Sequence, residues 1–298
     1  MNNVIHIEQH LRTKKEDQCF SILIPSWNNL PYLQLCVNAI RKNSHYRHQL
    51  LVHVNDGSDG TLQWVQQQPD LDYTCSTQNT GVCYPLNALA ALAYTDYILY
   101  INDDMYVCPG WDKFLMDEIQ SIGHPYFFIS GTAIEPVPQS KCSIGHSFGT
   151  DIQSFDEAAL LAQYQNLPMQ NWSGATWPPN VVHKQLWNLV GGYSTEFSPG
   201  MYSDPDFSMK LWQAGVRYFK GVAQSRVYHF GSLSVKRITK NRGYFTFILK
   251  WGMTNGSFSK HYLKRGEPFT GPLPEKELPG LVKLKSLWKQ LVAVFKRK

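Results

Sequence analysis

The stretch YILYINDDMYV, residues 97–107, decides the fold class predicted from this 298-residue sequence. Its first residues are mostly apolar, as in a strand buried in a core, and they run directly into two adjacent carboxylates, Asp103 and Asp104. Adjacent carboxylates at the end of a buried strand repel each other unless a positive charge lies beside them. The stretch therefore predicts a core strand that ends at a charged site.

Strand and helix signals alternate before this stretch. Strands are predicted at residues 20–25, 51–56 and 71–76, and helices at residues 30–43, 61–68 and 85–93. Repeated βα units form a mostly parallel sheet covered by helices, and ligands bind at the carboxyl ends of its strands, where Asp56 and Asp103 fall. The predicted fold class is α/β, with a Rossmann-like, mostly parallel central sheet flanked by helices.

The pattern changes in the second half of the chain. After a further strand in residues 126–137, a long loop is predicted at residues 138–179, with a helix near residues 155–165. Helices and strands return beyond it, at residues 184–193, 204–215, 216–230 and 240–252. We therefore divide the chain into two halves of one domain, residues 1–137 and 138–255, and a C-terminal tail, residues 256–298.

Composition indicates a globular protein that is made and kept inside the cell. Hydrophobic residues make up 43% of the chain, enough for a real core. We find no signal-type segment at the N-terminus and no run near the roughly 18 apolar residues of a membrane span. The six cysteines form no CxxC pair, so reduced, mostly buried thiols are predicted rather than disulfides or structural zinc.

The net charge of +5 is concentrated in the tail. Six of the 28 basic residues follow Gly280, which leaves 22 against 23 acidic residues in the body, so no nucleic-acid partner is predicted. On a helical wheel the tail has one broad apolar face with Trp288 and Phe295 and one face of lysines. Such a helix suits peripheral contact with an anionic membrane. Docking of the same helix on its own domain is the alternative.

Four short motifs follow the predicted strands in order. They are PSWNN at residues 25–29, NDGSDG at 55–60, QNTGVCYPLN at 78–87 and INDDM at 101–105. This series resembles the nucleotide-sugar-binding half of family 2 glycosyltransferases, which have the GT-A fold, and the resemblance covers residues 20–251. It implies a nucleotide-sugar donor, with UDP first and dTDP or GDP as alternatives, and a saccharide acceptor bound by the second half.

The resemblance implies a set of donor-binding residues. Asp56 would accept a hydrogen bond from the base. The others would line the nucleotide pocket or lie beneath the nucleotide and sugar: Pro25, Trp27, Asn28, Asn79, Gly81, Asn87 and Asp103.

A divalent metal site is implied by the same resemblance. Asp103 and Asp104 match the Asp-x-Asp-type site of the family, whose usual first acid is replaced here by Asn102, so Asp104 is the expected direct ligand. His229, in VYHFGS, matches a position where many relatives have a histidine that reaches the metal or the diphosphate. Carboxylates with open positions suit Mn²⁺ or Mg²⁺, which stabilise the charge that builds on a leaving diphosphate.

The segment GGYSTEFSPGMYSDPDFSMKLWQAG, residues 191–215, resembles the part of the family that supplies the catalytic base. On this alignment Asp204 deprotonates the acceptor hydroxyl, Ser203 replaces the preceding acid, and Asp206 is the alternative base. A purely structural role for Asp204 as the cap of the following helix, with Pro205 at its first position, also fits.

Four further residues follow in the chain. Lys236 and Arg237 are expected near the diphosphate or at the surface, and Lys250 and Trp251 at the border of the active site or in the core.

The motifs predict a metal-dependent inverting glycosyltransferase of polysaccharide or lipopolysaccharide type, in the cytoplasm and peripheral on the inner face of the plasma membrane. A lipid-linked or surface saccharide is the expected acceptor. The first strand-helix turn, PSWNNLPY, has no GxGxxG loop, which argues against a nucleotide-dependent oxidoreductase. Because Asn102 and Ser203 replace acids, a catalytically degenerate GT-A protein that only binds glycan or nucleotide, or serves as a scaffold, remains the alternative.

Overall fold

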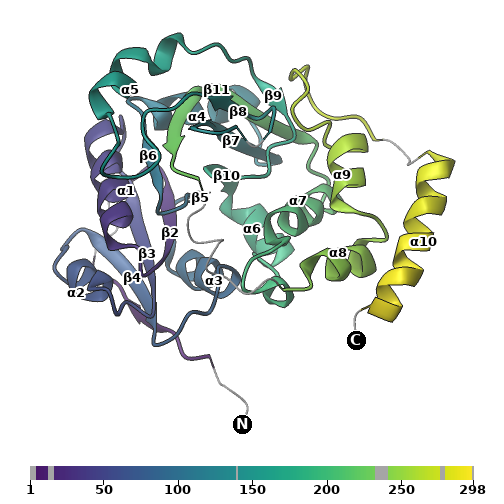
Figure 1. Cartoon of the computed structure of the whole chain (residues 1–298), viewed down its shortest axis with the longest axis horizontal. Coiled ribbons are helices and arrows are strands. Elements are labelled where there is room, and N and C mark those ends of the chain that lie inside the picture. Colours follow the sequence, from purple (N-terminus) through teal and green to yellow (C-terminus); the bar gives the residue numbers. More distant parts are fainter. Residues whose placement is uncertain (1–4, 13–16, 139, 232–240, 276–278, 297–298) are drawn as a thin grey trace.

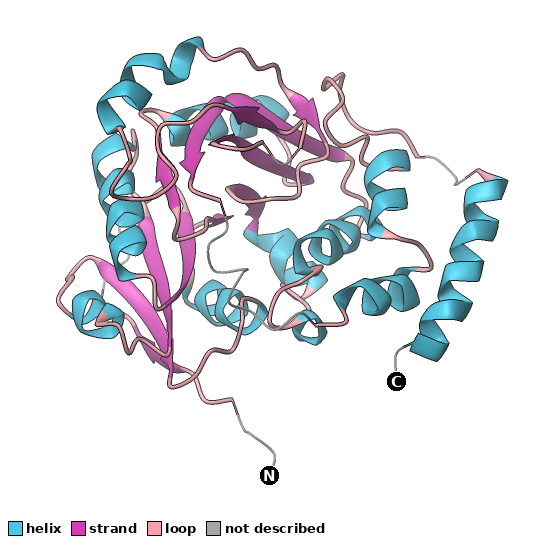
Figure 2. Cartoon of the chain, viewed as in Figure 1, coloured by secondary structure: helices cyan, strands magenta, loops and turns pink. Residues whose placement is uncertain are grey.

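A single eleven-stranded sheet forms the frame of the molecule, with helices packed around it (Figures 1 and 2). The structure is a computed structural model, and it describes residues 5–12, 17–138, 140–231, 241–275 and 279–296. Its strand order is β1-β4-β3-β2-β5-β10-β7-β11-β6, with β8 paired to β7 and β9 to β11. The longest pairings are parallel, so the predicted α/β class with a mostly parallel central sheet is confirmed.

The first half is built from βα units, as predicted. Its parallel strands are β2 (Ser21–Trp27), β3 (Gln49–Asn55), β4 (Leu71–Ser76) and β5 (Tyr97–Tyr100). The helices between them are α1 (Leu30–Asn43), α2 (Thr61–Gln66) and α3 (Cys83–Leu92). A short strand, β1 (Glu8–His10), adds an antiparallel edge to β4. All seven residues of β3 are buried, as expected for a strand covered on both faces.

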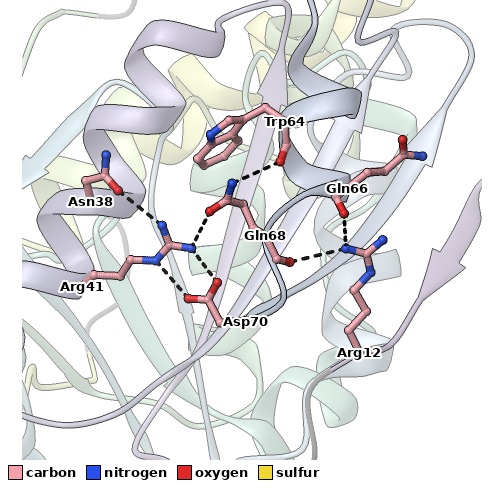
Figure 3. A network of polar contacts seen from close by, with 7 residues as sticks. All are labelled: Arg12, Asn38, Arg41, Trp64, Gln66, Gln68 and Asp70. Atoms are coloured by element: carbon pink, nitrogen blue, oxygen red, sulfur yellow. Dashed lines mark hydrogen bonds and ion pairs between the residues drawn. The ribbon is translucent and has the colours of Figure 1, made fainter.

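A polar network ties α1 to the turn between α2 and β4 (Figure 3). The guanidinium of Arg41 binds both carboxylate oxygens of Asp70, at 2.9 and 2.6 Å, and also donates to the side chains of Gln68 and Asn38. Arg12 donates to the carbonyl oxygens of Gln66 and Gln68 from the other side of the turn. The network fixes the outer edge of the first half, at a distance from the strand ends where the chemistry is predicted.

The stretch YILYINDDMYV, residues 97–107, contains two strands rather than one. β5 lies in the middle of the sheet, while β6 (Met105–Val107), only four residues further on, pairs with β11 at the end of the strand order. Five residues of extended chain reach about 17 Å, whereas four flat strand spacings need about 19 Å. The sheet must therefore curl, and the turn at Asn102–Asp104 lies inside the curl.

The rest of the chain completes this curl. The first half ends with α4 (Trp111–Ile122) and β7 (Phe127–Glu135). The second half contributes the strands β8 (Ser143–Gly145), β9 (Trp172–Ser173), β10 (Asn180–His183) and β11 (Tyr218–His229). Its helices are α5 (Glu157–Gln163), α6 (Lys184–Val190), α7 (Ser203–Gln213) and α8 (Gly243–Trp251), with 3-10 turns at Tyr164–Asn166 and Thr195–Phe197. The unpredicted strand β10 pairs antiparallel with both β5 and β7 and joins the two halves.

The C-terminal segment differs from the predicted tail. Helix α9 (Asn255–His261) and the chain after it pack on the body, where Gly266 and Leu273 donate backbone hydrogen bonds to Ser173 and Arg217. The amphipathic helix is α10 (Gly280–Lys296), which runs along the outside of the molecule beside α8 (Figure 1). Of the residues the structure describes, no helix is both long and apolar enough to cross a membrane. All six cysteines are free, and four of them are buried, in line with the prediction of mostly buried thiols.

Candidate active site

A cavity of about 620 Å³ lies at the carboxyl ends of the central strands, a volume in the usual range of small-ligand sites. Both halves of the chain line it. Eight of the predicted site residues are in its wall: Pro25, Trp27, Asn79, Gly81, Asp103, Asp104, Asp204 and His229. The other three, Asn28, Asp56 and Asn87, are described but stand behind or beside the wall.

Two carboxylates and a histidine form one row at neighbouring strand ends. Asp104 lies directly before β6, His229 ends β11 and Glu135 ends β7. Met105 of β6 pairs with His229 of β11, and the parallel register of β11 with β7 brings His229 level with Glu135. As a result His229 Nε2 lies 3.4 Å from Asp104 Oδ1, and His229 Nδ1 lies 2.8 Å from Glu135 Oε1. All three residues are buried.

The row favours a positive charge. Burial lowers the pKa of His229, but the negative charges of Asp104 and Glu135 outweigh it and raise the pKa to about 10. Either a proton on the imidazole of His229 or a divalent cation at Asp104 would offset the negative charge of the two carboxylates.

The donor set fits a divalent metal. Two ligand atoms at about 2.1 Å from one ion lie roughly 3 Å apart, close to the observed separation of Asp104 Oδ1 and His229 Nε2. Metal-bound histidines commonly donate their other ring N–H to a carboxylate, which is the contact His229 makes with Glu135. Asp103, also buried, lies beside Asp104 in the cavity wall. Asp104 and His229 are thus the residues that would hold Mn²⁺ or Mg²⁺.

The candidate base, Asp204, lies in the second position of α7. Its Oδ1 accepts a hydrogen bond from the hydroxyl of Tyr193, at 3.0 Å. Asp204 is deeply enclosed yet keeps part of its surface open to the cavity. Desolvation raises its pKa to about 7, against the smaller lowering effect of the Tyr193 hydrogen bond. A carboxylate whose pKa lies near neutral pH is well suited to accept a proton during a reaction.

The alternative that Asp204 serves as the helix cap is wrong. The N-cap of α7 is Tyr202, no side chain caps the helix there, and Pro205 is the third helical residue rather than the first. Tyr202 has a φ of 74°, a left-handed conformation that is unfavourable for an aromatic residue. This bend directly precedes α7 and orients the start of the helix toward the cavity. Tyr202, Ser203 and Asp204 accordingly all line the cavity wall.

Asp206, the alternative base, has a different environment. It is fully buried, and its Oδ1 accepts hydrogen bonds from Trp251 Nε1 at 2.8 Å and from Lys250 Nζ at 2.9 Å. None of these three residues lines the cavity, so the expectation that Lys250 and Trp251 border the active site is wrong. They hold α7 against α8. The geometry therefore favours Asp204 as the base.

The loop after β4 is held by Asn55. Its Oδ1 accepts from the backbone and side chain of Thr80, at 2.9 and 3.0 Å, and its Nδ2 donates to the carbonyl of Gly81. Gly81 has a φ of 81°, and a Cβ added there would lie 2.4 Å from Pro199 Cα. Glycine is required because the loop touches the 198–200 segment of the second half.

Asn28 and Asp56 lie next to cavity residues at the ends of β2 and β3. Asn28 Nδ2 donates to Asp56 Oδ2 at 2.9 Å, and both residues have positive φ angles, 44° and 65°. Asn and Asp tolerate this conformation better than other residues, and such angles gather at functional sites. The pair therefore forms a polar rim beside Trp27 rather than part of the wall.

Asn87 acts through another residue. Its amide donates to the carbonyl of Tyr193 and accepts from the Tyr193 backbone N–H, both at 2.8 Å. Helix α3 of the first half thus fixes Tyr193, which in turn binds Asp204.

Sequence reasoning missed the cavity residues Glu135 and Arg265, and it missed Tyr193, which is buried and binds the cavity residue Asp204. Tyr193 stands in the GGY part of a motif that was examined only for its acids, and Glu135 ends a strand that was predicted. Arg265 carried no signal, because the tail was expected to begin at residue 256. Lys236 and Arg237, expected near the diphosphate or at the surface, lie outside the described residues.

Comparisons with known proteins agree with this geometry. Residues 21–143 match the profile of Glycosyl transferase family 2. This segment, which contains all four motifs and the Asp103–Asp104 pair, is therefore similar to family 2 glycosyltransferases. A search of curated proteins finds no match for the chain.

Solved structures of S. aureus TarS are similar in fold. TarS 1-349 in complex with UDP aligns with a TM-score of 0.58 and 12% identity, over 91% of this chain and 70% of that one. TarS 1-349 in complex with UDP-GlcNAc aligns with a TM-score of 0.55 and 13% identity, over 93% and 72%. Another TarS structure matches with 43% of its own chain covered. At this identity the likeness establishes the GT-A-like fold.

Proposed function

We propose that this protein is a metal-dependent inverting glycosyltransferase that moves a sugar from a nucleotide-sugar donor to a saccharide acceptor. The observation that carries the proposal is the cavity itself. It joins two buried side chains that could hold a metal, Asp104 and His229, to a separate carboxylate, Asp204, whose pKa of about 7 suits proton transfer. The family 2 match of residues 21–143 supports the same reaction class.

Each half of the cavity has its own task in this reaction. Asp104 and His229 would hold Mn²⁺ or Mg²⁺ on the donor side of the cavity, and Glu135 orients the imidazole of His229. The metal, when bound, stabilises the negative charge on the leaving diphosphate. Asp204 takes the proton of the acceptor hydroxyl while Tyr193 holds its carboxylate in place. Direct attack with Asp204 as base inverts the anomeric carbon, so an α-linked donor gives a β-linked product.

A UDP-sugar is the preferred donor, with dTDP- and GDP-sugars as alternatives. TarS, which shares this fold, has been solved with UDP and with UDP-GlcNAc. The Asn28–Asp56 pair lies beside Trp27 at the cavity rim, where Asp56 would accept a hydrogen bond from the base.

A panel of UDP-, dTDP- and GDP-sugars tests the proposal. With Mn²⁺ present, release of nucleoside diphosphate is measured for the wild type, for Asp104→Ala and for the surface control Asp70→Ala. We expect one donor to be turned over by the wild type and the control and not by Asp104→Ala. If no donor is turned over while nucleotide still binds, the binding-only or scaffold alternative replaces this proposal.

We also propose that α10 attaches the enzyme to an anionic membrane, at the cytoplasmic inner face of the plasma membrane, where a lipid-linked or surface saccharide is the acceptor. The helix packs on the body through a face of small residues: Ser286 and Ala293 are buried, and Gln290 donates to the carbonyl of Ile248. The opposite face is apolar and mostly 56–80% exposed: Leu281, Leu284, Leu287, Trp288, Leu291, Val294 and Phe295.

The docked helix therefore leaves its membrane-type face free, and exposed lysines Lys283, Lys285 and Lys289 lie between the two faces. Co-sedimentation with vesicles of anionic or zwitterionic lipid tests this attachment. Trp288→Ser combined with Leu291→Ser is expected to weaken binding to anionic vesicles at least tenfold, whereas Leu189→Ser, at another exposed leucine, leaves it unchanged. Equal binding by all variants, or none by the wild type, would remove the membrane proposal.

A further inference from the structure

Arg265 brings a cation without a partner into the wall of the cavity. Its guanidinium lies 5.2 Å from the ring centre of Trp177, which also lines the cavity. The Nη1 atom is buried and makes no hydrogen bond. Among the described residues, no carboxylate forms an ion pair with Arg265 and no side-chain hydrogen bond reaches its guanidinium.

A second arginine shows what a purely structural Arg–Trp pair looks like in this fold. Arg217 stacks on Trp212 at 4.0 Å, outside the cavity. Its guanidinium also donates to the carbonyls of Trp212 and Val216 and to Glu275 Oε1, at 2.7, 2.8 and 3.0 Å. Arg265 has the aromatic neighbour but none of these acceptors.

The missing acceptors point to a ligand. Arg265 is partly buried, and its buried Nη1 atom lacks a hydrogen bond, which costs free energy unless an acceptor is supplied. An ion or ligand in the cavity is one source of such an acceptor. The planar fork of a guanidinium matches the two oxygens of a carboxylate or phosphate. An anionic group is therefore the complement of this part of the wall.

Tight packing of the backbone holds Arg265 in place. The Arg265 N–H donates to the carbonyl of Ser259 at 3.0 Å, and the next residue, Gly266, donates to the carbonyl of Ser173. A Cβ added at Gly174, where φ is 87°, would lie 2.7 Å from Arg265 Cα. The arginine is thus positioned by contacts on both sides before any ligand binds.

The position of Trp177 separates this subsite from the metal-ligand row. Two residues after Trp177, the carbonyl of Pro179 accepts from the N–H of Gly131 on β7, at 2.9 Å. Gly131 and Glu135 are four residues apart on the same strand, which is about 13 Å. On the proposed function the donor diphosphate lies at the Glu135 end, beside Asp104 and His229, and an anion held beside Trp177 would then come from the other substrate.

From these contacts we infer that Arg265, with Trp177, forms a subsite for a negatively charged group of the acceptor, so the acceptor is an anionic saccharide that carries a phosphate or a carboxylate. The inference rests on the proposed function, because that function assigns the diphosphate to the metal side of the cavity. Trp177 is 36% exposed, which leaves part of its ring surface for contact with the ligand.

Binding of small probes tests the subsite. Dissociation constants of glucose, glucose 6-phosphate and glucuronate are measured by titration calorimetry with the wild type, Arg265→Gln, Arg265→Lys and the control Arg217→Gln, each saturated with UDP and Mn²⁺. We expect at least one charged probe to bind the wild type and the control tenfold or more tightly than glucose. The preference is lost in Arg265→Gln and partly kept in Arg265→Lys.

Two results would overturn the inference: no charge preference in the wild type, or a charged probe that binds only without UDP, because it would then occupy the diphosphate position. UDP binding itself is measured in the same titrations. If the wild type does not bind UDP, the proposed function fails. In that case the dissociation constants of the charged and neutral probes are compared without UDP. A preference for the charged probe in the wild type that is lost in Arg265→Gln would still show that this part of the wall binds anions.

Discussion

Asp204 and Asp206 are two residues apart, yet their surroundings give them different properties. Asp204 faces the cavity and accepts a hydrogen bond from the hydroxyl of Tyr193, whereas Asp206 is buried against Lys250 and Trp251. We expect Asp204→Asn to lower kcat by about 10² to 10⁴ with unchanged affinity for UDP, since general-base catalysis contributes that much. Asp206→Asn is expected mainly to lower the melting temperature. A steady-state assay with a melting curve for each variant separates the two roles, and the opposite pattern would make Asp206 the base.

The pKa of Asp204 predicts the pH dependence of the reaction. Because only the ionised carboxylate accepts a proton, the rate is expected to fall about tenfold per pH unit below pH 7 and to level off above it. Tyr193→Phe removes the hydrogen bond that lowers this pKa, so the midpoint of its pH–rate profile moves to higher pH. A midpoint near pH 4 in the wild type would contradict the burial of the base.

The same pKa predicts a cost in stability. The folded-state pKa of Asp204 is raised from 3.8 to about 7, so the folded state loses stability as the pH rises through these values. Asp204→Asn removes the ionisable group, and its melting temperature is expected to exceed that of the wild type at pH 8. The difference should shrink toward pH 4, where the carboxyl is protonated in the folded state and already partly protonated in the unfolded state. Calorimetry at the two pH values checks this, and equal melting temperatures at pH 8 would contradict it.

Glu135 is expected to act on metal affinity through His229. Glu135→Gln keeps the shape of the side chain but removes its charge, and we expect it to weaken Mn²⁺ binding about 10- to 100-fold. Electron paramagnetic resonance of free Mn²⁺ gives the affinity. Because Glu8, His10 and Cys75 form another group of metal-ligand side chains, with ligand atoms within 4.8 Å, the measurement is made in a His10→Ala background. Unchanged affinity would mean that His229 needs no orienting partner.

At the scale of elements, the loop after β4 depends on Gly81. A side chain there would meet Pro199 at 2.4 to 2.5 Å, and the φ of 81° is unfavourable for any other residue. We expect Gly81→Ala to lower the free energy of unfolding by about 2 kcal/mol or more and to weaken UDP binding, as the loop moves away from the second half. Gly123→Ala is the control, because its φ of 68° is similar but nothing lies within 4 Å of an added Cβ; about 1 kcal/mol is expected there. Urea unfolding of both variants decides whether the contact or the backbone angle matters.

Local sequence patterns determine some elements and leave others unspecified. The predicted bounds of α1 and β4 agree with the structure, because α1 has buried residues at helical spacing and the six residues of β4 are mostly buried. Strand β10 was missed because four residues after two prolines, NVVH, become a strand only through pairing with β5 and β7. For α10, the spacing of apolar residues predicted the helix itself. The face of α10 that packs on the body is set by contacts with α8, which the local sequence does not reveal.

The same distinction holds for the whole site. Residues that end a predicted strand within a motif, such as Asp104 and Trp27, were placed in the cavity from sequence. Glu135 owes its position to the register of β7 with β11, and Arg265 owes its position to packing against Ser173, more than ninety residues earlier in the chain. No local pattern records either contact. The chemistry of the site was therefore predictable in kind, while the side chains that orient its groups were not.

The place of β10 in the sheet has a consequence for synthesis of the protein on the ribosome. Strand β5 leaves the exit tunnel some eighty residues before its partner β10, and β6 leaves it more than a hundred residues before its partner β11. Until these partners are synthesised, each strand has an edge with unpaired backbone hydrogen-bonding groups. The segment that matches the family profile ends at residue 143 and lacks both partners. Nascent chains that stall before residue 229 are therefore expected to be the form in which this protein aggregates and calls on chaperones.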